Sequence, residues 1–435
     1  MRRSRAGTIK RVTIAVCILS AVPLVTSPAI STAGESVGTR GRFIVILDPG
    51  VPPAATAQEH GRAFDASVRH VYRYALRGYE ATLPIEVVDS LRADSRVSAV
   101  VEDGVVSASG QLFPNGINRV DGELSSAASG DGGGLPVDVD VAVLDGRVQG
   151  SHPDLNVSGH VDCTSGAKPD PDDYHGTMVA GIIAAKDNGI GVVGIAPGAR
   201  IWSVQVLKKN GFGTIGNVMC GVDWVTGTHL DGNPANDIEV ANLSLGGPGA
   251  DDGDCGNTSR DALHQAICAS TDAGIVYTVS AGNAARDVAV EVPAAYDEVL
   301  TVTAMADLDG RPGAKNGRRC AEDDDTFADF SNFTSTADAA HAVAAPGVCI
   351  TSTTVRSNYL TGSGTSFASP HVAGMIALCI AGGDCAGLDA SGIVAKIVRD
   401  AQNYNEAEPS YGFVGDPQHP VAGMSFGHLV RAADY

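Results

Sequence analysis

Short apolar runs that alternate with helical stretches constrain this chain more than any other feature of its sequence. Five runs rich in Val, Ile and Leu occur after residue 136, at 137–144, 201–207, 238–245, 275–280 and 299–304. Helix-like segments lie between several of them, and this alternation is typical of a parallel sheet covered by helices on both faces. The sequence therefore predicts an α/β fold built on a doubly wound, mostly parallel sheet. In such sheets, ligands bind beyond the carboxyl ends of the strands.

Three polar residues stand at the ends of these predicted elements, in the chain order Asp, His, Ser. Asp145 follows the first apolar run, and His175 and Ser366 each begin a helical stretch. A serine hydroxyl is a poor nucleophile until a base lies within about 3 Å of it, and histidine titrates near neutrality. A carboxylate can hold the imidazole in one tautomer and stabilise the imidazolium. We expect Ser366 as a nucleophile, His175 as its base and Asp145 as the residue that orients the base.

A fourth residue could stabilise the negative charge that develops on a carbonyl oxygen under attack. Asn283 follows the apolar run that ends at Ser280, and its side-chain amide can donate a hydrogen bond. The backbone N–H groups at the start of the helix that carries Ser366 can donate as well. Taken singly, each of these residues would be interpreted as a helix cap or a structural group.

The segments around these residues resemble the subtilisin family of serine peptidases, which includes proteinase K. Asp145 ends Val-Ala-Val-Leu-Asp, His175 opens His-Gly-Thr-Met-Val-Ala-Gly, and Ser366 lies within Gly-Thr-Ser-Phe-Ala-Ser-Pro-His-Val-Ala-Gly. The Asp–His–Ser order is also that of subtilisin. The resemblance covers about residues 42–435. It implies the subtilisin fold and hydrolysis of peptide bonds through an acyl-enzyme, with no cofactor required for the chemistry.

The same resemblance implies which segments line the substrate cleft. An extended polypeptide would pair with two strands, so that main-chain bonds give affinity and pockets give selectivity. The implied cleft residues are Ser244, Leu245 and Gly246 on one strand, Gly211, Phe212 and Gly213 on the opposite edge strand, and Ala281 and Gly282 as a wall of the pocket for the side chain before the scissile bond. Residues 211–216 also fit Gly-x-Gly-x-x-Gly, but the next strand carries Glu239 near its start rather than an acidic residue at its carboxyl end, which argues against a dinucleotide-binding turn.

Two places depart from the family pattern. The residues after the triad Asp are commonly Thr or Ser and then Gly, whereas this chain has Gly146 and Arg147. Met178 stands where a second His is usual. These changes leave open a homologue that binds peptides without cutting them. A serine hydrolase that acts on esters in a small closed pocket is a further alternative, since a fold hosts several functions.

The first residues differ from the rest of the chain. A basic segment that ends at Arg11 precedes an apolar run at 12–25 and then small residues, which is the layout of a secretory signal peptide. The apolar run is short for a membrane span. We therefore expect a signal peptide at 1–33 and a secreted, extracellular protein.

Residues 42–103 predict a small domain of their own. Their apolar runs and proline-initiated helices follow the order β-α-β-β-α-β, which is the ferredoxin-like pattern. This segment resembles the propeptide of subtilisin-type proteases. The resemblance implies an inhibitory propeptide at 34–108, cut between Val105 and Phe113, and a peptidase domain at 109–435. A Gly- and Ser-rich linker is expected at 125–136.

Eight cysteines remain after the signal peptide, and an even number in an exported chain indicates disulfides. Proximity in the sequence suggests one pair of Cys255 with Cys268 and another of Cys379 with Cys385. Elimination then pairs Cys163 with Cys220 and Cys320 with Cys349.

A formal net charge of -20 argues against partners that are nucleic acids or anionic lipids. We expect a monomer whose partners are polypeptide substrates and its own propeptide. Many subtilisin-type proteases bind calcium on surface loops, and oxygen-rich clusters suit that ion. Structural calcium is therefore possible, without assigned ligands, at acidic clusters or near Asp297 and Val299. The clusters are Asp170, Asp172 and Asp173; Asp251, Asp252 and Asp254; and Glu322 to Asp325.

Overall fold

The computed structural model describes residues 40–103, 110–164, 172–313, 318–335 and 338–435. The expected signal peptide, most of the expected cleavage window and Asp170 lie outside these ranges. The chain divides into two compact units, Met1–Val105 and Val106–Tyr435, which are described one at a time.

The amino-terminal unit is a four-stranded antiparallel sheet with two helices. Its elements are β1 (Arg40–Leu47), α1 (Pro53–Ala63), β2 (Ser67–Tyr72), β3 (Gly78–Pro84), a 3₁₀ turn (Ile85–Val87), α2 (Val88–Arg92) and β4 (Val97–Glu102). The strand order β2-β3-β1-β4 confirms the predicted ferredoxin-like pattern. Val45, Tyr79 and Leu91 are fully buried between the sheet and the helices, so this unit has a hydrophobic core of its own.

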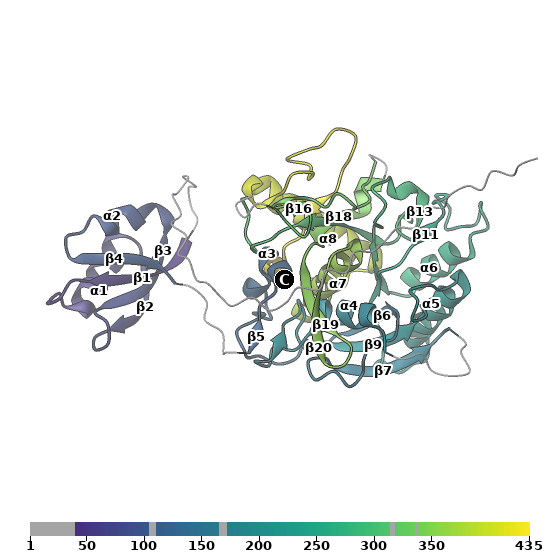
Figure 1. The fold of residues 1–435 in the computed structure, drawn as a ribbon, viewed down its shortest axis with the longest axis horizontal. Coiled ribbons are helices and arrows are strands. Elements are labelled where there is room, and N and C mark those ends of the chain that lie inside the picture. The colour runs from purple at the N-terminus through teal and green to yellow at the C-terminus, as the bar shows by residue number, and fades with distance from the viewer. Residues whose placement is uncertain (1–39, 104–109, 165–171, 314–317, 336–337) are drawn as a thin grey trace, which may run out of the picture. The chain divides into compact units, whose positions relative to one another are not determined.

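The second unit is built on a nine-stranded sheet (Figure 1). In spatial order its strands are β21 (His428–Leu429), β18 (Ala342–Pro346), β14 (Leu300–Ala306), β12 (Val276–Ser280), β10 (Val240–Leu243), β6 (Asp140–Asp145), β9 (Arg200–Gln205) and β7 (Val157–Asp162). All of these pair in parallel, and only β17 (Thr326–Phe327), which pairs with β14, is antiparallel. The five predicted apolar runs are β6, β9, β10, β12 and β14, which confirms the predicted mostly parallel sheet.

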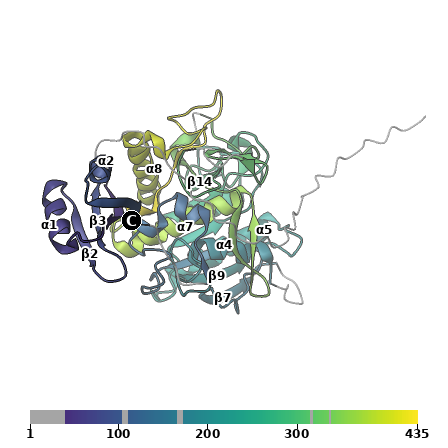
Figure 2. The same ribbon diagram turned by 60° about the vertical axis from the view of Figure 1, so that its left-hand side comes forward.

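Helices pack on both faces of this sheet (Figure 2). The helices of the unit are α3 (Asn115–Arg119), α4 (Tyr174–Ala184), α5 (Ile215–Leu230), α6 (Ala262–Asp272), α7 (Thr365–Gly382) and α8 (Ala390–Ala407). Buried side chains of α4, α7 and α8 belong to one hydrophobic cluster, and those of α5 and α6 belong to a second. A sheet whose strands are buried on both faces needs the continuous apolar runs that the sequence carries.

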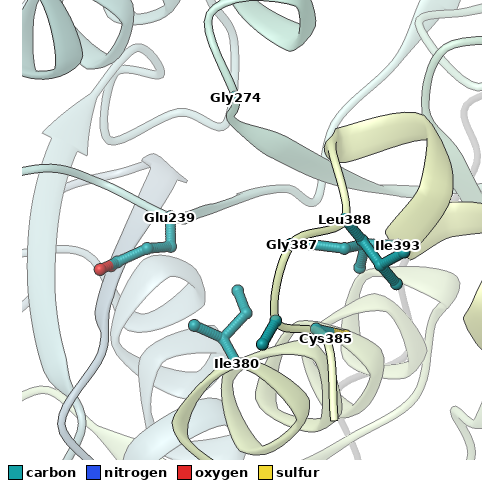
Figure 3. A pocket seen from close by; sticks show the side chains of 8 residues that line it. Glu239, Gly274, Ile380, Cys385, Gly387, Leu388 and Ile393 are labelled. Atoms are coloured by element: carbon teal, nitrogen blue, oxygen red, sulfur yellow. The ribbon is translucent and has the colours of Figure 1, made fainter. Parts of the chain in front are cut away.

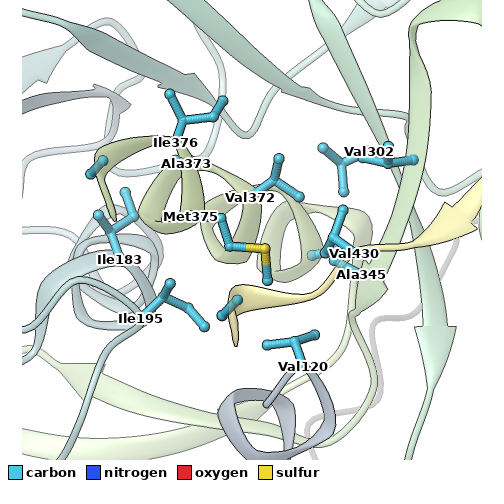
Figure 4. Packing of buried hydrophobic residues seen from close by; sticks show 14 of the residues in the cluster. Val120, Ile183, Ile195, Val302, Ala345, Val372, Ala373, Met375, Ile376 and Val430 are labelled. Carbon is cyan, nitrogen blue, oxygen red and sulfur yellow. The ribbon is translucent and has the colours of Figure 1, made fainter. Parts of the chain in front are cut away.

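Helix α7 is the central helix of the larger cluster. Its Val372, Met375 and Ile376 pack among side chains from α4, β14 and β18 (Figure 4). By length and composition alone, α7 is the one helix in the described part of the chain that could cross a membrane, but most of it is buried inside the unit. Its apolar character is therefore explained by its place in the core.

Short ribbons and turns complete the unit. The two-stranded ribbons are β5 (Gln111–Leu112) with β8 (Gly191–Val192), β11 (Gly247–Pro248) with β13 (Glu291–Val292), β15 (Arg318–Arg319) with β16 (Glu322–Asp323), and β19 (Ile350–Thr354) with β20 (Asn358–Gly362). The 3₁₀ turns are Gly122–Leu124, Val288–Val290, Asp338–His341, Pro409–Tyr411 and Ala432–Asp434.

Two predictions about chain connections have different outcomes. The four predicted disulfides are all present, Cys163–Cys220, Cys255–Cys268, Cys320–Cys349 and Cys379–Cys385. The flexible linker predicted at 125–136 is wrong at its start, because Ser129 is fully buried and its hydroxyl donates to the Ile195 carbonyl oxygen. Small residues there allow close packing rather than flexibility.

Candidate active site

The site lies where the strand order of the sheet reverses. Strands β6 and β10 are neighbours, and the chain leaves them in opposite directions, through β9 and β7 on one side and through β12 and β14 on the other. Such a switch point opens a crevice outside the carboxyl ends of the strands. Asp145 ends β6, Ser244 follows β10, and residues 281–283 follow β12, so three predicted site segments meet at this edge.

Asp145 and His175 are in direct contact. Both carboxylate oxygens of Asp145 lie 2.9 Å from Nδ1 of His175. The Asp145 side chain is 1% exposed and that of His175 is 24% exposed. Burial disfavours the imidazolium, but the charge and hydrogen bond of Asp145, with the charge of Asp173, outweigh it and raise the pKa of His175 above 6.5. Because Nδ1 faces Asp145, the other ring nitrogen, Nε2, can exchange a proton with a group other than Asp145.

A second carboxylate fixes the helix that carries His175. Asp173 is the N-cap of α4, and its Oδ1 accepts a hydrogen bond of 2.8 Å from the His175 backbone N–H. Gly146 leaves room for it, because a Cβ at Gly146 would lie 2.7 Å from both Cβ and Cγ of Asp173. Gly146, which stands where the family usually has Thr or Ser, therefore leaves the space that the Asp173 side chain occupies.

We expect Gly146→Ser, which moves the chain toward the usual family residue, to damage the protein. The new Cβ would force Asp173 out of its cap, and losing such a cap costs about 0.5–2 kcal/mol. A melting temperature lowered by a few degrees, together with a lower kcat, is the expected result. Gly150→Ser is the matched control, because the nearest atom to a Cβ there is 3.9 Å away. Equal behaviour of the two variants would contradict this account.

Ser366 lies in the first turn of α7, beside the histidine. The ring of the next residue, Phe367, has its centroid 5.6 Å from that of His175. Among the described residues, the Ser366 hydroxyl donates to the Ser244 carbonyl oxygen at 3.4 Å rather than to His175. Catalytic hydrogen bonds are often long before substrate binds. The structure therefore brings all three predicted triad residues to one place, with the Asp–His contact formed.

A proline fixes the backbone at Ser366. Pro370 lies inside α7 and has no N–H to donate to the carbonyl four residues earlier, which belongs to Ser366. The Ser244 hydroxyl donates to that freed oxygen at 2.8 Å. The end of β10 and the start of α7 are thereby joined through the same two residues.

Asn283 and the Ser366 backbone nitrogen both lie near Gly364. The Oδ1 of Asn283 accepts hydrogen bonds from the Thr365 backbone N–H at 2.9 Å and from its hydroxyl at 3.0 Å. This fixes the amide plane and leaves Nδ2 to donate elsewhere. A Cβ built on Gly364 would lie 3.7 Å from Asn283 Nδ2 and 3.8 Å from the Ser366 nitrogen. Both predicted donors therefore lie close to Gly364 at the start of α7.

The loop that carries Asn283 is held by Asn332, a buried residue that the sequence analysis missed. Its Nδ2 donates to the Ala281 carbonyl oxygen, and its Oδ1 accepts from the N–H groups of Ala284 and Arg286. Gly282, at φ +101°, packs against Asn332, and a Cβ at Gly282 would lie only 2.5 Å from Asn332 Nδ2. Glycine is therefore required at this position.

A second missed residue, Asn242, fastens three elements together. Its Oδ1 accepts from Thr278 in β12 and from Ser369 in α7, and its Nδ2 donates to the Ser244 hydroxyl. Asn242 is fully buried in β10, and a buried amide with its partners satisfied rigidifies its surroundings. No local motif marked it, because Ser369 is 127 positions away.

The structure places the predicted cleft segments in different surroundings. Residues 244–246 and 281–282 lie on either side of Glu291, whose side chain would meet a Cβ at Gly246 at 2.7 Å and one at Gly282 at 3.4 Å. Glu291 pairs with Arg286 and was missed by the sequence analysis. In the chain by itself, Gly211, Phe212 and Gly213 form an exposed loop between β9 and α5, so their role as an edge strand beside the substrate stays a prediction. Phe212 is 74% exposed there.

The other departures from the family pattern have structural explanations. Arg147 pairs with Asp172, with 3.3 Å between Nε and Oδ1. Met178 is fully buried and packs with Ile182, Ile350 and Phe367, so it fills the core beneath the helix that carries Ser366.

Calcium near Asp297 and Val299 finds little support in the described residues. His341 occupies that position, with Nδ1 3.0 Å from the Val299 carbonyl oxygen and Nε2 3.7 Å from Asp297 Oδ1. An imidazole is a poor ligand for a hard cation.

A separate hollow of about 260 Å³ is lined by Glu239, Gly274 and the segment around Cys385 (Figure 3). Glu239 and Gly274 precede β10 and β12, so this hollow lies at the amino ends of the strands, away from the site above.

Comparison with known proteins agrees with this architecture. Residues 137–414 match the subtilase family, described as Peptidase_S8. The chain belongs to the subtilase family. This confirms the resemblance found in the sequence.

Several curated relatives of this subtilase are known. The M-protease of Shouchella clausii is 35% identical over 294 residues, which cover 67% of this chain but 66% of that protein, just under two thirds. The thermostable alkaline protease of Halalkalibacterium halodurans is 31% identical, covering 85% of this chain and 88% of that protein. Subtilisin E of Bacillus subtilis is 32% identical, covering 84% and 88%.

The fold also matches a solved structure. The crystal structure of a cold adapted subtilisin-like serine proteinase superimposes with a TM-score of 0.53 at 24% identity, covering 73% of this chain and 97% of that one. At that identity the match supports the fold, and the predicted subtilisin-like α/β fold is confirmed.

Proposed function

We propose that this subtilase is a secreted serine endopeptidase that is made as an autoprocessed precursor. The proposal depends above all on one observation: a buried carboxylate holds a partly exposed histidine whose ring lies near Phe367, the residue after Ser366, at the switch point of the sheet. Family membership and the names of the relatives, which are proteases and subtilisins, support it.

The proposed reaction assigns one task to each residue. Ser366 Oγ attacks the carbonyl carbon of a peptide bond while His175 Nε2 takes the hydroxyl proton. Asp145 keeps the His175 proton on Nδ1 and stabilises the imidazolium. The carbonyl oxygen, now negatively charged, accepts hydrogen bonds from Asn283 Nδ2 and the Ser366 N–H. His175 then gives its proton to the leaving amine, and water releases the acyl group by the same steps.

Polypeptides in extended form are the proposed substrates. Residues 244–246 would pair with the substrate main chain on one side, and residues 211–213 could pair on the other once a substrate supplies the missing partner. Glu291, between the two segments proposed to line the pocket, gives that pocket a carboxylate that is paired with Arg286.

The amino-terminal unit is proposed to be an inhibitory propeptide at 34–108, preceding the peptidase domain at 109–435. Its ferredoxin-like order supports this. The Subtilisin E match covers a larger share of the chain than residues 106–435 make up, so it must extend into this unit. The signal-like sequence at 1–33 and the four disulfides support secretion.

Asn283→Ala is expected to reduce kcat by about 10²–10³-fold, the usual effect of removing one oxyanion donor from this kind of site. KM for a peptide substrate should change little, since the donor acts on the charge that develops in the transition state. Steady-state kinetics on a chromogenic peptide would measure both. Less than a tenfold loss of kcat would count against the role of Asn283.

Active-site labelling tests the whole proposal. A fluorophosphonate probe should label the secreted, matured protein and should not label Ser366→Ala. Absence of labelling in correctly matured wild type would favour a homologue that binds peptides without cutting them. The pairing of Arg147 with Asp172, and the fit of Gly146 to Asp173, remove the sequence-based reason to favour that alternative.

A further inference from the structure

A buried histidine outside the active site has an unusual set of neighbours. His264 lies in the first turn of α6, and its side chain is 1% exposed. Its Nε2 is 2.8 Å from Oε2 of Glu298. An ionised carboxylate can accept but not donate, so Nε2 donates this hydrogen bond, and Nδ1 is the ring nitrogen that is left to bind another partner.

Two further carboxylates face that ring nitrogen. Oδ1 of Asp252 is 3.6 Å and Oδ1 of Asp251 is 3.9 Å from His264 Nδ1. Within the described ranges, this buried nitrogen has no hydrogen-bond partner. Both separations are too long for a hydrogen bond. Two ligands of one tetrahedral ion with bonds of about 2.1 Å lie about 3.4 Å apart, so a small movement of both carboxylates toward His264 Nδ1 would complete such a site.

We propose that Asp251, Asp252 and His264 bind a divalent transition-metal ion of the Zn²⁺ class. Their three ligand atoms lie within 4.8 Å of one another. A buried polar atom without a hydrogen-bond partner is unfavourable, and a cation bound between His264 Nδ1 and the two carboxylates removes that cost. Mixed imidazole and carboxylate ligands suit Zn²⁺, whereas Ca²⁺ takes oxygen ligands. Glu298 then acts as the outer carboxylate that orients the ligating histidine.

The surrounding contacts hold the ligands in position before any ion binds. The His264 ring stacks on Tyr296, with centroids 4.0 Å apart and planes 2° apart. The Tyr296 hydroxyl donates to Asp261 at 2.7 Å, and Asp261 caps α6 at the backbone N–H of His264. The ring is therefore fixed by the same residue that starts its helix.

Asp252 is held by the loop itself. Its Oδ2 accepts from the backbone N–H and the hydroxyl of Ser259, and its Oδ1 accepts from the backbone N–H groups of Asp254 and Gly256. These bonds lower the pKa of Asp252 well below its usual range. The nearby Cys255 and Cys268 are bonded to each other, so their sulfurs are not needed as ligands.

The test is metal binding to the whole secreted chain after treatment with a chelator. Zn²⁺ should bind one-to-one by calorimetry and raise the melting temperature by about 5 °C at a hundredfold excess over its dissociation constant. Co²⁺ should give the visible absorption bands of a site with a nitrogen ligand. Ca²⁺ at the same concentration should have neither effect.

Variants of the loop separate a ligand role from a structural one. Asp251→Asn and His264→Gln should each abolish the Co²⁺ bands and the Zn²⁺ effect on melting. Asp251 is partly exposed, so its variant should fold even where the buried His264→Gln does not. Asp254→Asn is the matched control, because the Asp254 carboxylate accepts from the Thr258 hydroxyl.

Four results would overturn the proposal. They are no Zn²⁺ binding by the wild type, equal binding by Asp251→Asn, stabilisation by Ca²⁺ without a Co²⁺ spectrum, and a nuclear magnetic resonance signal showing His264 Nδ1 still protonated in saturating Zn²⁺. None of these measurements uses peptidase activity, so the proposal stands or falls separately from the proposed function.

Discussion

Ser366→Ala should yield a secreted chain that cuts neither casein nor its own precursor. Removing the nucleophile from a working triad costs about 10⁶-fold in kcat, because no other group can form the acyl-enzyme. The amino-terminal unit should therefore stay attached, whereas the wild type should show a new amino terminus between Val105 and Phe113. Gel electrophoresis and amino-terminal sequencing would detect the precursor, and a fluorogenic peptide would measure residual turnover.

The matched control for this prediction is Ser363→Ala, three residues earlier, between β20 and α7. Ser363 is exposed, and its hydroxyl oxygen accepts a hydrogen bond from the Cys349 N–H at 3.0 Å. We expect this variant to be processed and active. A Ser366→Ala chain that matured in the absence of any other peptidase would show that another group makes the cut.

Asp145→Asn should lower kcat by about 10⁴-fold while the fold is retained. An amide can donate to Nδ1, which permits the wrong imidazole tautomer and removes the charge that stabilises the imidazolium. His175 must be neutral to act as a base, so activity falls as pH drops through its pKa, which lies above 6.5 in the wild type. Without the carboxylate, burial dominates and the acid limb of the residual activity should move to lower pH.

A pH profile of kcat/KM for both proteins would measure this shift. Asp172→Asn is a suitable control, since Asp172 pairs with Arg147 rather than with His175. An unchanged acid limb in Asp145→Asn would mean that His175 is not the group whose titration controls the rate.

The amount that could be predicted from the sequence depended on how far apart the interacting residues lie. Asp145, His175 and Ser366 each stand inside a long local string and at the end of an apolar run, so they could be proposed without a structure. Asn332 and Asn242 could not. The partners of Asn332 are 46 to 51 positions away, and those of Asn242 in β12 and α7 are 36 and 127 positions away. Such contacts exist only once the sheet and α7 have assembled.

Edge strands are harder to predict for the same physical reason. β7 was missed because its side chains alternate between half-buried and exposed at the edge of the sheet, so it has no continuous apolar run. The strand expected at 211–213 depends on a partner that the chain itself does not supply. The sequence could identify buried central strands, but edges are determined by what pairs with them.

The buried amide of Asn332 has a consequence for how this protein is produced. Asn332-Phe333-Thr334 is an acceptor sequence for N-linked glycosylation. A eukaryotic secretory host attaches its glycan as the chain emerges, before Asn332 can close over Ala281 and Ala284. A sugar on that nitrogen would occupy the atom that donates to Ala281, in a residue that is fully buried once folded. Bacterial expression avoids that modification. In yeast or insect cells, glycosylation of Asn332 would compete with folding of the loop that carries Asn283.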